Sequence, residues 1–118
     1  MSANLYNRDG EAIAYLEEDG AIFSFDGDAL GYLVDQQVYD YGGNFLGWFQ
    51  NGWLHDRYND PALFTRDARG GPLKPLPSLP SLKSLQSLRP LKSLRELPPL
   101  QPLRGSNWSA LSGVSYFQ

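Results

Sequence analysis

The sequence contains no cysteine and only one histidine, His55. Disulfide bonds and thiolate metal sites are therefore excluded, as is a catalytic or metal-binding group built on several histidines. A nucleophile motif and a phosphate-binding glycine loop are also missing. We expect a protein that is not an enzyme and that has no cofactor and no metal.

Long apolar runs are also absent. No stretch reaches the roughly 20 residues of a transmembrane helix. Residues 1–6 have neither the basic start nor the apolar run of a signal peptide. The default expectation is a cytoplasmic protein that does not contact a membrane, with signal-less export as the alternative.

Charge is distributed unevenly along the chain. Residues 1–68 carry 12 acidic and 3 basic residues, a net charge of −9, whereas residues 69–118 carry 7 basic and 1 acidic residue, a net charge of +6. The basic residues are single and spaced, and an acidic head would repel phosphate, so we expect no nucleic-acid partner. Attraction between head and tail is expected instead, within one chain or between chains.

The head contains four similar segments. Hexapeptides that begin at Leu5, Ile22, Val38 and Leu54 align with spacings of 17, 16 and 16 residues. Asp-Gly and Gly-Gly pairs within them predict two-residue hairpin turns between short, aromatic-rich strands. We therefore predict an all-β fold, in which about eight strands form a meander of four pseudo-symmetric hairpins that share a centre or close on themselves. Helix is disfavoured by the frequent glycines.

The fourth segment departs from this pattern. It lacks the turn glycine and has Pro61 where the other segments have Ala12, Ala29 and Phe45. Proline cannot donate to a sheet ladder, so we expect the second strand of this hairpin to be an edge strand or distorted.

Two segments carry a resemblance to a known family. They are residues 22–27 (IFSFDG) with 30–32 (LGY), and residues 38–43 (VYDYGG) with 46–49 (LGWF). This pattern, which covers about residues 4–65, resembles the four-fold β-flower family of small, mostly uncharacterised proteins. The Pro/Leu-rich tail and residues 106–109 also resemble the region after the domain in members of that family. The resemblance implies a pseudo-symmetric fold of four hairpins and supplies no catalytic residues.

The tail has a leucine at every third position. Eight prolines within residues 72–102 exclude α and 3₁₀ helices, whereas polyproline II has three residues per turn and tolerates proline. We predict an extended, polyproline II-like tail with all its leucines on one edge. The leucines are Leu73, Leu76, Leu79, Leu82, Leu85, Leu88, Leu91, Leu94, Leu97, Leu100 and Leu103.

A continuous leucine edge is expected to pack against something equally long. Other copies of the tail qualify, as does a groove along the heads, either its own or a neighbour's. The alternative is a low-complexity linker whose period reflects repeat expansion. The closing segment, residues 105–118, is apolar again, and we expect it to dock through Trp108, Leu111, Val114 and Phe117.

Three rings stand at matching positions of the first three repeats: Tyr15, Tyr32 and Trp48. Rings so placed either form the core of a small β fold or line aromatic pockets for a ligand such as a sugar or a quaternary amine. His55 takes the position held by a ring in the other repeats and is expected to be structural.

The predicted organisation is a head at 4–66, a linker at 67–71, the leucine-edged tail at 72–104 and a docking segment at 105–118. The predicted function is non-enzymatic assembly into a homo-oligomer or filament, with the eleven leucines and Trp108 as the interface. The alternative is a small binding module with aromatic pockets at Tyr15, Tyr32 and Trp48, and with the tail as a spacer or peptide ligand.

Overall fold

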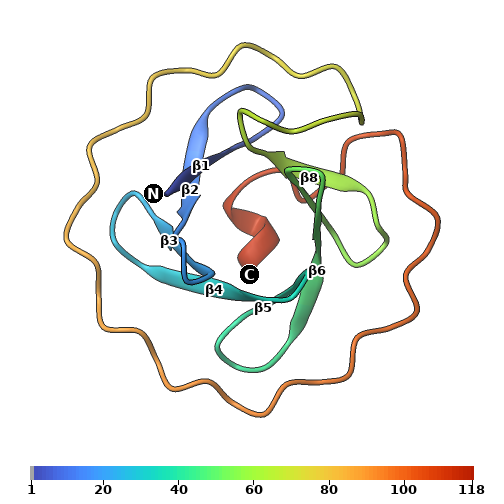
Figure 1. Ribbon diagram of the computed structural model, residues 1–118. Helices are drawn as coiled ribbons and strands as arrows, with labels where there is room; N and C mark the ends of the chain where they lie inside the picture. Colours follow the sequence, from blue (N-terminus) through green and yellow to red (C-terminus); the bar gives the residue numbers. More distant parts are fainter. Residues whose placement is uncertain (1) are drawn as a thin grey trace.

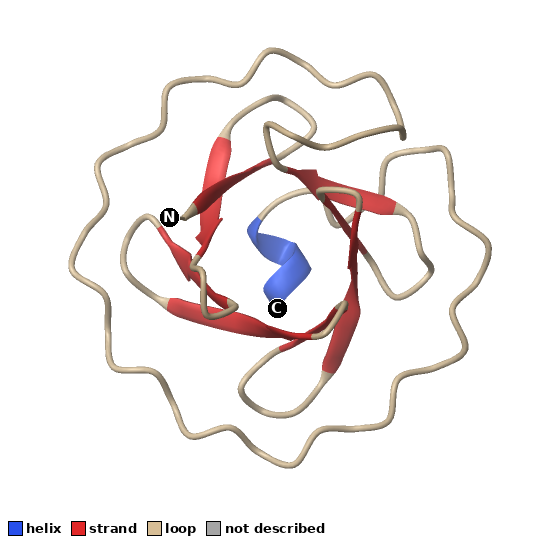
Figure 2. Ribbon diagram, in the orientation of Figure 1, coloured by secondary structure: helices blue, strands red, loops and turns tan. Residues whose placement is uncertain are grey.

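The computed structural model describes residues 2–118, and its centre is a closed antiparallel barrel of eight strands joined in chain order (Figures 1 and 2). The prediction of an all-β meander of four hairpins is confirmed. The strands are β1 (Ala3–Tyr6), β2 (Ala12–Leu16), β3 (Ala21–Ser24), β4 (Ala29–Val34), β5 (Gln37–Tyr39), β6 (Phe45–Gln50), β7 (Trp53–His55) and β8 (Pro61–Phe64).

The last strand closes the barrel, so the expectation of an edge strand in the fourth repeat is wrong. β8 pairs with β7 along its length and with β1 through Tyr6 and Phe64. Pro61 is tolerated because it is the first residue of its strand, where a missing ladder donor costs least. All four hairpins have a register shift at the same place, so the fourth is no more irregular than the others.

Side chains alternate between the two sides of the barrel wall. Leu5, Ile22, Val38 and Leu54 occupy equivalent positions and meet in one fully buried aliphatic cluster at the centre. The residue that follows each of them points to the other side of the strand. Three of these four residues are aromatic, so the outer wall is as apolar as the inner one and needs a cover of its own.

The hairpin turns inside the repeats have three-residue loops rather than the predicted two. In the first, Gly10 N–H donates to Asn7 and Asn7 N–H donates to Glu11. Only the glycine has a positive φ, of 82°, which fits a type I turn followed by a glycine bulge. Between repeats, Asn51 and Gly52 do form a two-residue loop with both φ angles positive.

The chain ends inside the barrel. A short 3₁₀ helix, η1 (Val114–Phe117), lies at its centre in Figures 1 and 2, and Tyr116 is 2% exposed there. The Tyr116 hydroxyl donates to the backbone carbonyl of His55 at 2.8 Å. Gly47 leaves the space, since a Cβ at this position would lie 2.6 Å from that hydroxyl. Burial raises the pKa of the Tyr116 phenol well above its usual range, so the group stays a donor.

The tail encircles the barrel instead of projecting from it. Residues 72–104, drawn from yellow to red in Figure 1, have no helix or strand and run around the outside of the hairpins. The whole molecule is a disc whose Cα atoms span 36 × 35 × 23 Å. Among the residues that the structure describes, no helix is both long and apolar enough to cross a membrane.

Replacing Tyr116 with Phe tests the central plug. The buried carbonyl of His55 would lose its side-chain donor, and we expect the free energy of unfolding to fall by about 1–3 kcal/mol. Urea unfolding followed by Trp fluorescence measures this change. Tyr58→Phe is the matched control, because Tyr58 is 71% exposed and its change should stay within about 0.5 kcal/mol. Equal stability of the two variants would contradict the role given to Tyr116.

Candidate assembly surface

The tail is bound to the barrel by its own main chain. The N–H groups of Ser78, Ser87 and Glu96 donate to the carbonyls of the turn glycines Gly10, Gly27 and Gly43 at 2.8–2.9 Å, and a fourth bond joins Gly105 to Asn59. The donors are nine residues apart, whereas the acceptors are 17, 16 and 16 apart. One nine-residue unit of tail therefore spans one hairpin repeat of the barrel.

A second set of main-chain bonds follows the same spacing. Ser84 donates to Phe25 and Ser93 donates to Tyr41, each at 2.9 Å. The positions nine residues before and after this pair are Pro75 and Pro102, which have no N–H to donate. The series of equivalent tail positions thus has donating serines in the middle and prolines, which cannot donate, at its two ends.

The turn glycines are required for this close approach. A Cβ on Gly10, Gly27 or Gly43 would collide with the backbone carbonyl oxygen of the nearby tail leucine. All three also have φ between 82° and 94°, a region that favours glycine. The fourth turn has Asn59 at this position, with φ of 66°, and its side chain donates to the carbonyl of Pro102 at 2.7 Å. At this turn the polar side chain adds a second hydrogen bond to the main-chain bond between Gly105 and Asn59.

Basic side chains of the tail lie over aromatic rings of the outer barrel wall. Lys83 Nζ is 4.1 Å from the centre of the Tyr15 ring, and Lys92 Nζ is 4.3 Å from that of Tyr32. Such cation–π contacts stabilise by about 0.5–2 kcal/mol each. The same arrangement recurs with arginine, in the pairs Arg89–Phe23 and Arg95–Tyr39, with 5.4 and 5.6 Å from guanidinium carbon to ring centre.

The three aromatic side chains predicted as possible ligand positions are all buried in the outer wall of the barrel. Tyr15, Tyr32 and Trp48 are at most 4% exposed, beneath the tail. Tyr15 and Tyr32 already have a cation of the same chain over their rings, and Trp48 packs edge-on against Phe45 at 4.8 Å. Their role as ligand positions stays a prediction, and it would require the tail to move.

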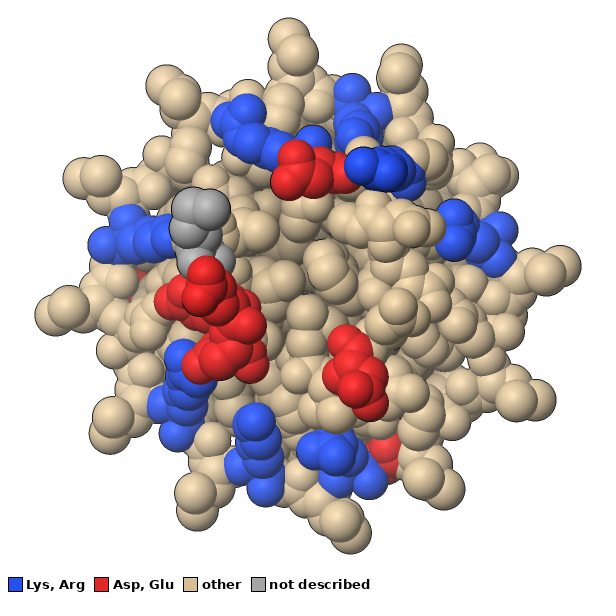
Figure 3. All heavy atoms as spheres, in the orientation of Figure 1, with Lys and Arg blue, Asp and Glu red and all other residues tan. Residues whose placement is uncertain are grey.

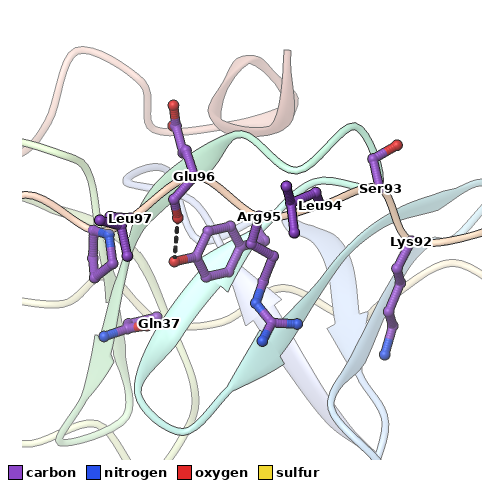
Figure 4. Close-up of a pocket in the computed structure, with 9 residues that line it drawn as sticks. Gln37, Lys92, Ser93, Leu94, Arg95, Glu96 and Leu97 are labelled. Atoms are coloured by element: carbon purple, nitrogen blue, oxygen red, sulfur yellow. Dashed lines mark hydrogen bonds between the residues drawn. The ribbon is translucent and has the colours of Figure 1, made fainter.

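An ion pair and a surface hollow lie along the part of the tail that contains Arg89 and Arg95. Arg89 donates to Asp19 at 2.6 Å, which lowers the pKa of that carboxyl group, although both side chains are about half exposed. Further along, Tyr39 donates to the carbonyl of Glu96 at 3.0 Å beside a hollow of about 570 Å³ (Figure 4). Arg95 also lines this hollow, so the hollow lies along the contact between the tail and the barrel.

The tail leucines all face away from the barrel. Each of the eleven, from Leu73 to Leu103, is 91–96% exposed. Uncharged side chains project from the rim of the disc at regular intervals in Figure 3, just outside a ring of Lys and Arg. We call these eleven side chains the leucine belt. Their use as a contact surface between copies, predicted from the sequence, stays a prediction.

Trp108 lies elsewhere. It packs against Trp53 and Phe64 of its own barrel, with ring centres 5.4 and 6.1 Å away, and Ser109 donates to the buried carboxylate of Asp56 at 2.5 Å. The last turn of chain then brings Phe117 into the barrel, where it is 8% exposed. Of the other two expected docking residues, Leu111 is 36% and Val114 44% exposed. A role of Trp108 in contacts between copies stays a prediction.

His55 is buried between the wall and the end of the tail. It is 2% exposed, and its Nδ1 lies 2.9 Å from the carbonyl of Asn59, which also accepts from Gly105. Burial lowers the pKa of the His55 imidazole below 6.5. Within residues 2–118, no group of three or more His, Asp or Glu side chains is placed to hold a metal ion.

The sequence predicted a leucine at every third position along one edge of the tail, but not that the two residues between successive leucines contact the barrel. Residues whose numbers are multiples of three are mostly Ser or Pro, and every main-chain N–H of the tail that donates to the barrel belongs to this set. The residue after each leucine supplies the cations that lie over the rings. The recurrence of Lys74, Lys83 and Lys92 at intervals of nine was the available signal for the larger unit.

Replacing Gly27 with Ala tests whether the tail packs directly against the hairpin turn. The new methyl group would push the carbonyl of Leu85 away, and we expect trypsin to cut the tail faster at Lys83 and Lys92. Gly70→Ala is the matched control, because Gly70 also has a positive φ but has no atom within 4 Å of its Cβ position. Cleavage at equal rates in the two variants would show that the tail does not rest on the turn.

The buried histidine predicts a pH dependence of stability. Because the pKa of His55 is lower in the folded state, the unfolded chain takes up a proton first, and stability should fall as the pH drops below about 6.5. His55→Phe should remove this component, whatever its effect on stability at neutral pH. Melting temperatures between pH 5.5 and 7.5 measure the difference, and parallel curves for the two proteins would refute the assignment.

Comparison with known proteins agrees with this architecture. Residues 3–117 match the model of one family, described as 4-fold beta flower protein. No curated protein matches the chain, and no solved structure matches it. Since the match spans nearly the whole sequence, tail and closing segment included, the chain belongs to the 4-fold beta flower family.

Proposed function

We propose that this chain is a non-enzymatic structural protein that associates with other copies of itself through the leucine belt, as a homo-oligomer or filament. The observation that supports this most is the outward direction of all eleven leucines. A leucine edge that served only to hold the tail in place would face the barrel. Here the main chain and the cations hold the tail, and the leucines remain available.

The aromatic outer wall of the barrel is not available to a second tail, because the tail of the same chain covers it. Among the alternatives left open by the sequence, contact between tails of different copies is therefore favoured over contact between a tail and a neighbouring head. The acidic head and basic tail already meet within one chain, as in the pair of Asp19 and Arg89.

The energy of one contact is modest. Full burial of a leucine side chain contributes about 1.5–3 kcal/mol. Two convex rims bring only a few leucines of each copy together, and association itself costs about 4–15 kcal/mol in lost freedom of movement. A single contact is therefore weak, and stable association needs several contacts per copy.

We further propose polyproline II backbone geometry for residues 72–104. Three observations support it: the leucines are exposed at every third residue, the N–H donors recur at multiples of three, and eight prolines are accommodated. In this geometry three rows of side chains run along the tail, and each row keeps one direction as the tail curves around the barrel.

Replacing Leu82, Leu85, Leu88 and Leu91 with Gln tests the belt. These side chains contact little else, so we expect an unchanged melting temperature. In light scattering, the mass should shift toward the 13.2 kDa of the single chain. The same four positions changed to Met should keep the association, since Met preserves the apolar surface.

Two outcomes would oppose the proposal. If the wild-type protein is a monomer at all concentrations, the belt does not mediate self-association. If the Gln variant unfolds at a markedly lower temperature, the leucines stabilise the fold and are not a free surface.

A further inference from the structure

The leucine belt runs around nearly the whole circumference of the disc. Each nine-residue unit of tail spans one of four repeats and contains three leucines, which corresponds to twelve positions per turn. Eleven are filled, and the gap falls where the tail leaves the barrel after Gly71 and returns at Gly105 (Figure 1). The belt therefore has no preferred side, apart from this gap.

The visible face of the disc differs from its rim. Figure 3 shows Lys and Arg around the margin of this face and groups of Asp and Glu nearer its centre. Stacking on such a face would remove both kinds of charge from water, whereas contact at the rim removes mainly leucine side chains. Among the described residues, the large apolar side chains that are more than nine-tenths exposed are the leucines of the belt.

A convex edge limits what one partner can cover. A second copy placed against the rim reaches only a short arc, and the remaining leucines stay in water. A closed dimer would therefore leave most of the belt exposed on both copies. The belt is covered only when a copy has neighbours on all sides, and identical discs do this by lying in one plane.

Resting on the proposed self-association, we infer that the copies pack edge to edge into a layer one molecule thick. In square or hexagonal packing of discs each copy has four or six neighbours, so each contact would involve about two or three of the eleven leucines. Because each contact alone is weak, layers form cooperatively above a threshold concentration, and small oligomers stay scarce below it.

Atomic force microscopy and electron microscopy of the concentrated wild-type protein test this inference. We expect flat sheets with the height of one disc, set by its 23 Å short dimension plus side chains, and a lateral repeat somewhat above 36 Å. Filaments, stacked columns or closed oligomers would overturn the layer while leaving self-association intact. A monomer at every concentration would overturn both proposals.

A set of arc variants tests the number of neighbours. One variant carries Gln at Leu73, Leu76 and Leu79, a second at Leu82, Leu85 and Leu88, and a third at Leu91, Leu94 and Leu97. In a layer, each variant should raise the threshold concentration several-fold and to a similar extent. If one variant abolishes association and the other two behave like the wild type, the belt has a single binding arc and the layer is refuted.

Discussion

The main-chain hydrogen bonds between the tail and the hairpin turns determine where every other group of the tail lies. The turn carbonyls of Gly10, Gly27, Gly43 and Asn59 are spaced around the barrel by its repeat, and the tail meets them every nine residues. Because nine is a multiple of three, a chain that repeats every three residues presents the same face at each meeting point. A spacing that is not a multiple of three would rotate the leucines toward the barrel in one quarter and away from it in the next.

This constraint reverses the usual relation between apolar residues and burial. The outer wall of the barrel is aromatic, and it is covered by backbone, Ser, Pro and the stems and charges of Lys and Arg. The leucines of the tail, which are the most apolar residues of residues 72–104, are 91–96% exposed. In ordinary globular proteins such residues drive folding, whereas here they lie free on a tail held in place by polar and cation–π contacts.

Much of the fold could be predicted from the sequence, because the hairpin repeats, their glycine turns and the aromatic strands are local signals. Closure of the barrel was one of two arrangements that the sequence left open, since pairing of Tyr6 with Phe64 joins the two ends of the meander and has no local signature. The path of the tail was missed for a related reason. A leucine period of three indicates a straight edge that seeks a partner, and only the spacing of nine, compared with that of the hairpins, shows that the other two faces are used by the barrel. The belt itself was predicted by residue, but its outward direction depends on those contacts.

Amide hydrogen exchange measured by NMR tests the register most directly. We expect slow exchange at Ser78, Ser84, Ser87, Ser93 and Glu96, whose N–H groups donate to the barrel, and fast exchange at the leucine amides between them. The pattern should repeat along the tail with the periods of three and nine. Uniformly fast exchange from residue 72 to residue 104 would contradict it, because a tail without those bonds would have no fixed face and the leucine belt would not exist.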